Sequence, residues 1–391
     1  MKLVVIGLGQ CGGRIADEFA RLNRKASRQR GIEIVTGVFA VNTDGADLSG
    51  LTSIKSDYQH RILIGGRKTG GHGVGKINEL GAEVAREDAD KVIDAIRATK
   101  RFYETDAFLL IAGAAGGTGS GSISVITQHL KERYVDKPVY TVVVLPFEHE
   151  EQVEERTIYN AATCLKSTYS VADAVILIEN QRYIRKDSSL SNNLSKINAL
   201  IAEPFYNLLC AGEEKKPKYI GAKVLDAGDI MQTVVGWTVI GYGTSQVPVI
   251  RFPGQQTRDF RKRGSETQKG VQTMDAAMSE LSLNCNPADS RRALYLVSAP
   301  TREMNVDLIK ELGDYLRSTA PQAIIRNGDY PREKGSLEVT IILSELSDVE
   351  KIRYYYTKST SLIPATKKRQ EETEIKLKAI EETSKDIPSL L

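Results

Sequence analysis

Glycine and hydroxyl side chains gather in one stretch of the chain where they could bind an anion. Residues 112–121 read AGAAGGTGSG and follow a short apolar run. The glycines let the backbone approach a ligand closely, and Thr118 and Ser120 add hydroxyl groups. A helical pattern follows over 123–134, so free N–H groups and the positive end of a helix dipole favour a phosphate here. A glycine-rich turn that only packs tightly is the alternative.

A second glycine turn lies near the start of the chain. Residues 7–13, GLGQCGG, follow an apolar strand and precede an amphipathic helix that we expect to run to about Ser27. The spacing matches the GxGxxG of dinucleotide-binding folds, so a NAD-dependent enzyme that uses Asp44 as its acidic residue is an alternative. Such an enzyme has no use for the turn at Gly116. Two phosphate-facing helix N-termini suit a nucleoside triphosphate better.

Two further segments carry polar or glycine residues after apolar runs. Asn42-Thr43-Asp44 ends a predicted strand, where an ordinary Asx turn is the alternative. The loop 65–76, GGRKTGGHGVGK, nearly spells a P-loop. Ile77 stands where that motif needs Ser or Thr to bind magnesium, which excludes the Walker interpretation. The loop could still wrap a γ-phosphate with backbone N–H groups.

Strands and helices must position these motifs, and they alternate through the first half of the chain. This alternation predicts an α/β fold with a mostly parallel, Rossmann-like sheet covered on both faces. Ligands of such sheets bind at the carboxyl ends of the strands, where the motifs fall. The expected strands are 2–6, 34–41, 61–64, 106–111, 139–145 and 173–178, the last taken as the end of this sheet, and the expected helices are 76–99 and 190–210.

Three motifs carry a resemblance to a known family. Residues 115–121, AGGTGSG, resemble the GGGTGSG signature of the tubulin/FtsZ superfamily, with alanine at the first glycine. Residues 9–12, GQCG, are similar to a motif near the start of tubulins. Residues 71–83 resemble the archaeal CetZ branch. The chain is identified as a member of this superfamily, closest to CetZ, over residues 1 to about 345.

The resemblance implies a GTPase domain joined by a central helix to a smaller α+β domain. We expect the nucleotide-binding domain at 1–185, the central helix and catalytic loop at 186–229, the α+β domain at 230–362 and a charged C-terminal helix at 363–391. Within the last two parts we expect helices at 230–242, 274–283, 304–317 and 365–385 and strands at 293–297, 323–326 and 337–343.

The resemblance also implies GTP or GDP as the ligand, together with Mg²⁺. Asp44 would hold the magnesium ion through water, and we expect no residue to bind a metal directly. The residues that the motifs place around the nucleotide are Gly9, Gln10, Cys11, Gly12, Asn42, Asp44, Gly71, Gly73, Ala115, Gly116, Gly117, Thr118, Gly119, Ser120 and Gly121.

Further nucleotide contacts are implied after the strands 139–145 and 173–178. One glutamate and one arginine of the family hold the ribose and phosphates, and Glu151 and Arg156 are the candidates. Asn180 and Asn198 stand where the family places two base-contacting asparagines, and an amide group can pair with guanine. Helix caps or turns are the alternative for both asparagines. Leu194 replaces the aromatic residue that usually stacks on the base.

Two carboxylates follow the central helix. Asp226 and Asp229 begin a predicted helix, where a cap and a dipole partner are the ordinary explanation. Their segment resembles the NVDxxD loop of FtsZ, with Val224 at the asparagine. The resemblance implies that Asp229, and secondarily Asp226, orients water at the nucleotide of the next subunit, so that head-to-tail assembly into filaments switches on hydrolysis. A GTP-binding regulator or scaffold that does not polymerise efficiently is the alternative.

Composition limits the other classes of function. The chain has 391 residues, 41% hydrophobic and 26% charged, and a net charge of +3, which argues against a nucleic-acid partner. Its four cysteines are far apart, and no segment has the apolar length of a membrane span or the pattern of a signal peptide. We therefore expect a cytoplasmic protein, and the resemblance to the tubulin/FtsZ superfamily implies a role in cell shape or division. Its main partner would be itself, and a membrane adaptor or regulatory proteins would be others.

Overall fold

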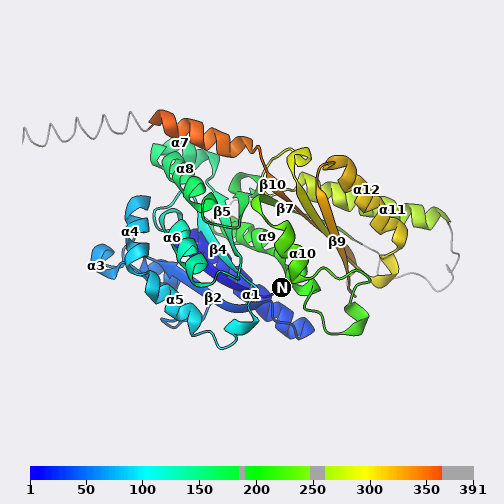
Figure 1. The fold of residues 1–391 in the computed structure, drawn as a ribbon, viewed down its shortest axis with the longest axis horizontal. Helices are drawn as coiled ribbons and strands as arrows, with labels where there is room; N and C mark the ends of the chain where they lie inside the picture. The colour runs from blue at the N-terminus through cyan, green and yellow to red at the C-terminus, as the bar shows by residue number, and fades with distance from the viewer. Residues whose placement is uncertain (185–189, 247–259, 334, 363–391) are drawn as a thin grey trace, which may run out of the picture.

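The computed structural model of the protein describes residues 1–184, 190–246, 260–333 and 335–362. In these residues a single sheet runs through the molecule with the strand order β3-β2-β1-β4-β5-β6-β7-β10-β8-β9 (Figure 1). Its strands are β1 Leu3–Leu8, β2 Val35–Asn42, β3 Arg61–Leu63, β4 Ala107–Gly113, β5 Val139–Leu145, β6 Ala174–Glu179, β7 Gly236–Gln246, β8 Arg292–Ala299, β9 Ile324–Pro331 and β10 Ser336–Leu346. The α/β fold class predicted from the sequence is confirmed.

Helices cover both faces of the sheet. They are α1 Gly9–Arg30, α2 Gly45–Ser49, α3 Gly66–Thr69, α4 Asn78–Glu87, α5 Ala89–Arg97, α6 Thr118–Arg133, α7 Glu148–Val153, α8 Glu155–Tyr169, α9 Leu190–Ala211, α10 Ala227–Thr233, α11 Phe260–Ser279 and α12 Val306–Thr319, with a further helix over 350–362. Short 3₁₀ helices, among them η2 Asn180–Tyr183, lie in the connections.

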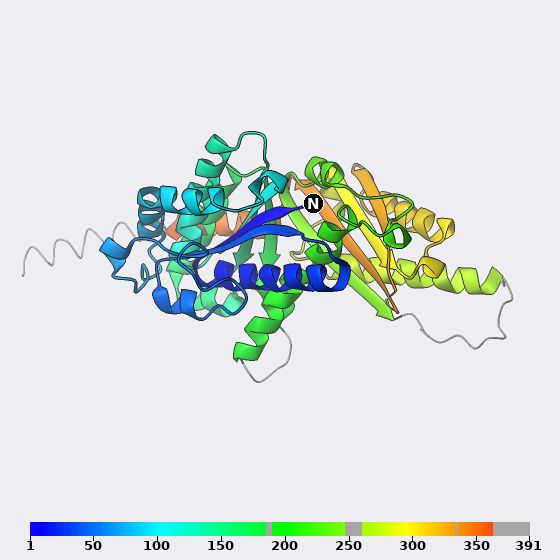
Figure 2. The same ribbon diagram turned by 90° about the horizontal axis from the view of Figure 1, so that it is seen from below.

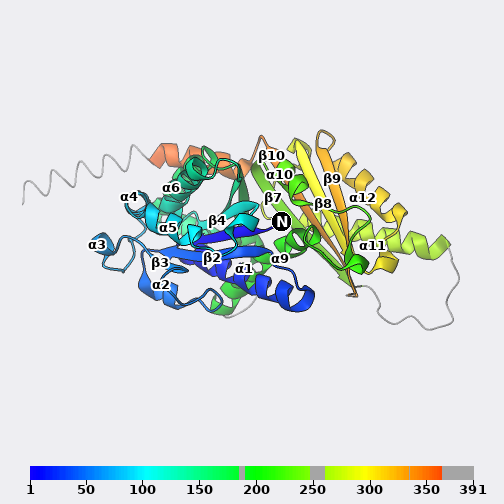
Figure 3. The same cartoon turned by 60° about the horizontal axis from the view of Figure 1, so that its bottom comes forward.

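The core is divided into two layers by the sheet. On one face α1 and α9 pack over β1, β4 and β5, as the view from below shows (Figure 2). On the other face α4, α5, α6 and α8 cover the parallel strands, and α11 and α12 cover β7 to β10 (Figure 3). Strands β4 and β5 are almost entirely buried, as expected for apolar strands of a parallel sheet that is covered on both faces.

The sheet does not end at β6, which corrects one prediction. Ala174, Val175 and Ile176 of β6 pair in parallel with Gly236, Trp237 and Thr238 of β7. Beyond them β7 pairs antiparallel with β10, which pairs antiparallel with β8. The two halves therefore share one backbone hydrogen-bond network, and the apolar pattern of a single strand could not show which further strand would join its edge.

Two helix predictions were wrong for local reasons. The predicted helix 230–242 is mostly strand β7, because Val234, Val235 and Trp237 favour extended backbone. The predicted helix 76–99 breaks into α4 and α5 at Asp88, whose carboxylate accepts a hydrogen bond from the backbone N–H of Gly65 at 2.6 Å. The helix predicted at 274–283 begins earlier, as α11, and the helix over 350–362 was not predicted. The predicted helix 365–385 lies outside the described residues.

Candidate nucleotide site

A hollow of about 380 Å³ opens at the carboxyl ends of β1, β2, β4, β5 and β6. This is the edge of the sheet at which the sequence placed its motifs. The predicted residues that line it are Gly9, Gln10, Cys11, Asn42, Asp44, Gly73, Ala115, Gly116, Gly117, Thr118, Gly119, Asn180, Leu194 and Asn198. The structure thus brings together residues from six separate segments of the chain, and the size is that of a small-molecule site.

The N-termini of α1 and α6 face this hollow, and no described side chain caps their first backbone N–H groups. Neither α1 nor α6 has a side-chain cap in the described part of the chain, and neither has an acidic residue in its first turn. In contrast, Asp44 caps α2 and Asn305 caps α12. The free N–H groups and aligned dipoles of α1 and α6 therefore remain available for an anion, and this arrangement fits phosphate groups.

The two glycine turns pack against each other at the floor of the hollow. Gly9 has a φ of +69°, and a Cβ atom built on it would lie 2.9 Å from the backbone nitrogen of Gly119. A Cβ atom on Gly119 would lie 2.8 Å from the carbonyl oxygen of Leu8. At Gly116, by contrast, no described atom lies within 4 Å of the added Cβ, because this residue faces open space. Glycine is needed at the first two positions for packing and at the third only for access.

The loop after β3 closes one side of the hollow. Gly73 donates its backbone N–H to the carbonyl oxygen of Thr43 at 3.0 Å, and the Thr43 hydroxyl lies 2.6 Å from that of Thr118. Lys76 also lines the hollow, and its ammonium pairs with Glu154 at 2.6 Å. The loop is thereby tied to the turn that begins α6, so a ligand held there contacts both.

Two carboxylates, those of Asp44 and Asp47, lie just after the end of β2, and both accept hydrogen bonds from neighbouring groups. Asp44 Oδ1 accepts hydrogen bonds from the backbone N–H groups of Ala46 and Asp47 at 2.8 and 3.1 Å. The Asp47 carboxylate, which sequence reasoning missed, accepts from the side-chain amides of Gln10 and Asn42 at 2.7 and 3.0 Å. Among the described residues no group of three acidic, histidine or cysteine side chains could hold a metal ion. Oxygen ligands near phosphates fit Mg²⁺ bound together with a nucleotide.

One side of the hollow is formed by η2 and α9. Asn180 begins η2 directly after β6, and Asn198 lies on α9. Leu194 and Asn198 are four residues apart, so they lie on the same face of that helix, and Ile197 lines the hollow beside them. The two amides and two apolar side chains can hold a planar polar base between them.

Two predicted contacts are corrected by the structure. Glu151 is buried away from the hollow, where it accepts a hydrogen bond from the Tyr355 hydroxyl, and Glu150 lines the hollow instead. Consecutive helical residues point about 100° apart, so the adjacent residues Glu150 and Glu151 lie in two different environments. Glu150 accepts from the backbone N–H of Phe147 at 2.9 Å.

Arg156 also lies outside the hollow as the structure describes it. Its guanidinium bonds to Glu79 and stacks 5.3 Å from the ring centre of Tyr159. Arg14 is the arginine that lines the hollow. It follows Gln10 by one helical turn on α1, which was the missed signal.

Four other predicted residues, Gly12, Gly71, Ser120 and Gly121, are not among the described residues that line the hollow. They support the residues that do line it. A Cβ atom on Gly12 would lie 1.9 Å from the carbonyl oxygen of Ile111, and one on Gly121 would lie 2.1 Å from that of Asn78. The Ser120 hydroxyl donates to the carbonyl oxygen of Gly116. The carbonyl oxygen of Gly71 accepts from the backbone N–H of Gly45 at 3.0 Å.

Cys11 is not suited to nucleophilic chemistry. Burial raises the pKa of its thiol to about 12, and the nearby Glu150 carboxylate acts in the same direction. The thiol is therefore protonated near neutral pH, and only the thiolate is a strong nucleophile. Cys11 contributes shape to the hollow.

Asp226 and Asp229 lie at the opposite edge of the sheet. The helix α10 directly precedes β7, whose first residue Gly236 is level with Ala174, the first residue of β6. The hollow lies at the other end of β6, about 20 Å away for a strand of this length. Asp226 Oδ1 caps α10 by accepting from the backbone N–H of Asp229 at 2.9 Å. Asp229 is partly exposed and lies 3.3 Å from the Arg326 guanidinium.

In the part of the chain that the structure describes, no helix combines the length and apolar character needed to cross a membrane.

Comparisons with known proteins agree with this geometry. Residues 2–186 match the model of the tubulin/FtsZ family GTPase domain, and residues 187–360 match that of the C-terminal domain of tubulin-like CetZ. The tubulin-like protein CetZ1 of Haloferax volcanii is 33% identical over 368 residues, which cover 90% of each chain.

Solved structures give the same assignment. A GDP-bound monomer of Haloferax volcanii CetZ1 superposes with a TM-score of 0.79 and 29% identity, covering 93% of this chain and 99% of that one. A GTPγS-bound protofilament of CetZ2 from the same organism gives a TM-score of 0.80 and 27% identity, covering 94% and 100%. With two family models that together span nearly the whole chain, the protein belongs to the tubulin/FtsZ family, in its CetZ group.

Proposed function

We propose that this protein binds GTP and hydrolyses it in head-to-tail filaments, each active site being completed by Asp229 and Asp226 of the adjacent subunit. The observation that carries the proposal is the separation of two half-sites. The phosphate-binding turns lie at the carboxyl edge of the parallel sheet, and the acidic pair lies at the amino edge. Within one chain the sheet keeps the two half-sites apart, but stacking two chains along the strand direction can bring them together.

Guanine nucleotides are the proposed ligands. Asn180 and Asn198 offer amide groups to the base, and the N-termini of α1 and α6 offer N–H groups to the phosphates. The structures similar to this chain are described as GDP-bound and GTPγS-bound. Bound Mg²⁺ would neutralise phosphate charge, and Asp44 and Asp47 are carboxylates of the hollow that could hold it through water.

The chemical role of the neighbour is orientation of water. The residues of the hollow bind the phosphates but include no described carboxylate beyond Asp44, Asp47 and Glu150, and each of these already accepts hydrogen bonds from amides or N–H groups around it. A carboxylate supplied across a contact can accept a hydrogen bond from the attacking water and take its proton late in the reaction. Asp229 is the first candidate because the carboxylate of Asp226 already serves as the cap of α10.

The chain can be divided into parts according to these proposed roles. We propose residues 1–185 as the nucleotide-binding part, 186–229 as the central helix and catalytic loop, 230–362 as the α+β part and 363–391 as a C-terminal tail. A role in cell shape or division, in the cytoplasm and with adaptor or regulatory proteins as further partners, is the biological task that we propose for the filament.

The direct test is GTP turnover per subunit as a function of protein concentration, with electron microscopy of the same samples. We expect the specific rate to rise with concentration and filaments to appear only with GTP and Mg²⁺. A flat rate would reject the shared site. It would favour a GTP-binding regulator or scaffold that does not polymerise efficiently. Chromatography of the nucleotide released on denaturation checks the guanine assignment against a dinucleotide.

A further inference from the structure

The helix over 350–362 docks on the GTPase domain although it belongs to the C-terminal part of the chain. Ile352 and Tyr355 are buried in the same apolar cluster as Ile158 and Leu165 of α8. Figure 1 shows this helix, in orange, lying along α7 and α8. The contact therefore links the last described helix to the elements that border the nucleotide site.

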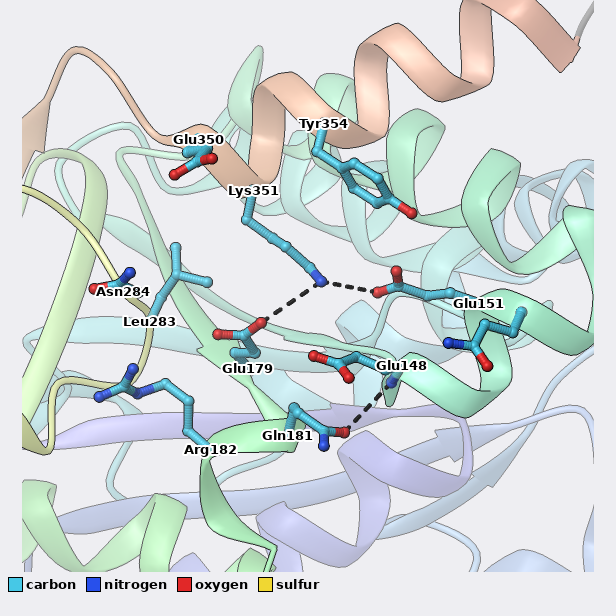
Figure 4. A pocket seen from close by; sticks show the side chains of 11 residues that line it. Glu148, Glu151, Glu179, Gln181, Arg182, Leu283, Asn284, Glu350, Lys351 and Tyr354 are labelled. Carbon is cyan, nitrogen blue, oxygen red and sulfur yellow. Dashed lines mark hydrogen bonds and ion pairs between the residues drawn. The ribbon is translucent and has the colours of Figure 1, made fainter.

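At the start of this helix, one ammonium group bridges two carboxylates from different elements. Lys351 Nζ lies 3.1 Å from Glu151 Oε1 of α7 and 3.6 Å from Glu179 Oε1 at the end of β6. Figure 4 shows the three side chains converging in a second hollow, which Glu148 and Gln181 also line. Their side chains are only 20%, 7% and 14% exposed, so the pairing is poorly screened by solvent.

Each of these carboxylates is the direct neighbour of a residue that lines the nucleotide site. Glu151 follows Glu150, and Glu179 precedes Asn180. A second link joins the same two elements, because the backbone N–H of Glu148 donates to Gln181 Oε1 at 3.4 Å. Thus α7 and η2 each contribute a residue to the hollow, Glu150 and Asn180, and Lys351 ties α7 to the end of β6 directly before η2.

Without the Lys351 ammonium, the negative charges of Glu151 and Glu179 would favour a separation of α7 from η2. Two carboxylates face one ammonium, and the Tyr355 hydroxyl donates only to Glu151. The charge of both carboxylates raises the pKa of Lys351 against the opposing effect of its burial, so the amine stays protonated near neutral pH. Without it, two poorly solvated like charges would repel each other, and α7 could move away from η2.

We propose that Lys351 is a positioning residue that holds Glu150 and Asn180 at the spacing required for nucleotide binding, and so makes the docking of the C-terminal helix a condition for high affinity. This inference rests on the proposed nucleotide site. It assigns no contact between Lys351 and the nucleotide. Because coupling is reciprocal, a bound nucleotide also stabilises the docked helix.

The test compares Lys351→Met with Lys358→Met, which makes the same change at an exposed position of the same helix. GDP is titrated into each full-length variant by calorimetry, and thermal unfolding without nucleotide is recorded in parallel. We expect Lys351→Met to raise the Kd for GDP about ten-fold, as typical for a lost coupling contact, and Lys358→Met to leave it unchanged. In turnover assays the KM for GTP should rise more than kcat falls.

Two further variants separate positioning from simple loss of stability. Lys351→Arg keeps the charge and should bind GDP within about three-fold of the wild type. Adding Glu179→Gln to Lys351→Met removes the repulsion and should recover part of the affinity. If Lys351→Met does not fold, Glu179→Gln alone, which removes one of the two ties, should still raise the Kd.

The outcomes distinguish this inference from the proposed function. A wild-type protein that binds GDP while folded Lys351→Met binds it equally well would overturn the positioning role alone. A loss of affinity in Lys351→Met that is not relieved by Glu179→Gln, and is matched by an equal loss in Lys351→Arg, would also overturn it. A wild-type protein that binds no GDP would overturn both.

Discussion

The two edges of the parallel sheet carry helix N-termini of opposite chemistry. At the carboxyl edge, α1 and α6 begin without a cap or an acidic residue within the described chain, and their N–H groups face a hollow. At the amino edge, α10 begins with Asp226 as its cap and Asp229 in its first turn. An end without acids can bind an anion, whereas an acidic end repels one and can orient water. The difference shows how one chain can carry two incomplete halves of a hydrolytic site.

The largest effect is expected from Asp229→Ala, which removes the carboxylate of the acidic edge. We expect GTP turnover in concentrated protein to fall about 100-fold or more, the usual cost of a lost group that stabilises the transition state. GDP affinity, measured by calorimetry, should not change, because the hollow is left intact. Asp90→Ala is the matched control, since Asp90 also lies in the first turn of a helix and pairs with an arginine, Arg133, at 3.1 Å.

If Asp229→Ala hydrolysed GTP at the wild-type rate, the two edges would not belong to one site.

A charge placed at the open edge tests whether that edge binds an anion. Gly116 has room for a side chain among the described residues, so Gly116→Asp should fold normally. One added charge about 5 Å from a phosphate costs about 3 kcal/mol, and the Kd for GDP should rise about 100-fold. Gly116→Asn has the same shape without the charge. Equal losses in both variants would mean that shape, and not charge, matters at this position.

The two roles of Asp226 can be separated by a pair of substitutions. Asp226→Ala removes the cap of α10 and should lower the free energy of unfolding by about 1 kcal/mol, measured with denaturant. Asp226→Asn keeps an oxygen that can accept from the Asp229 N–H, so stability should be retained. If the carboxylate assists hydrolysis, both variants lose turnover. Full turnover in Asp226→Asn would leave Asp226 as a cap only.

The smallest effect concerns the base side of the carboxyl edge. Leu194→Tyr adds a ring next to the proposed base position, and stacking should tighten GDP binding about three- to ten-fold. Leu200→Tyr changes an exposed residue of the same helix that does not line the hollow within the described chain, and it should have no effect. Weaker binding by Leu194→Tyr would show that the leucine fills space that a ring cannot enter.

Much of the carboxyl edge could be predicted because its residues are close in sequence to strand ends. Gly9 and Asn180 directly follow β1 and β6, Asn42 is the last residue of β2, and Gly116 lies three residues after β4. Parallel strands bring these ends to one edge. The errors concern helices. Glu150 lines the hollow in place of Glu151, because a helix turns by about 100° per residue and the sequence did not fix where α7 begins. Arg14 of α1 lines it in place of Arg156, which lies on α8.

The sequence by itself determined the strands of the parallel half of the sheet, where glycine is required and which helix N-termini lack acids, because apolar runs, glycine spacing and charge are local properties. Only the tertiary structure decided that β7 continues the sheet, that the acidic pair lies at the far edge, and that Lys351 joins Glu151 to Glu179. These are contacts between segments up to about two hundred residues apart, and a pairing of that kind depends on how the whole chain packs rather than on any local pattern.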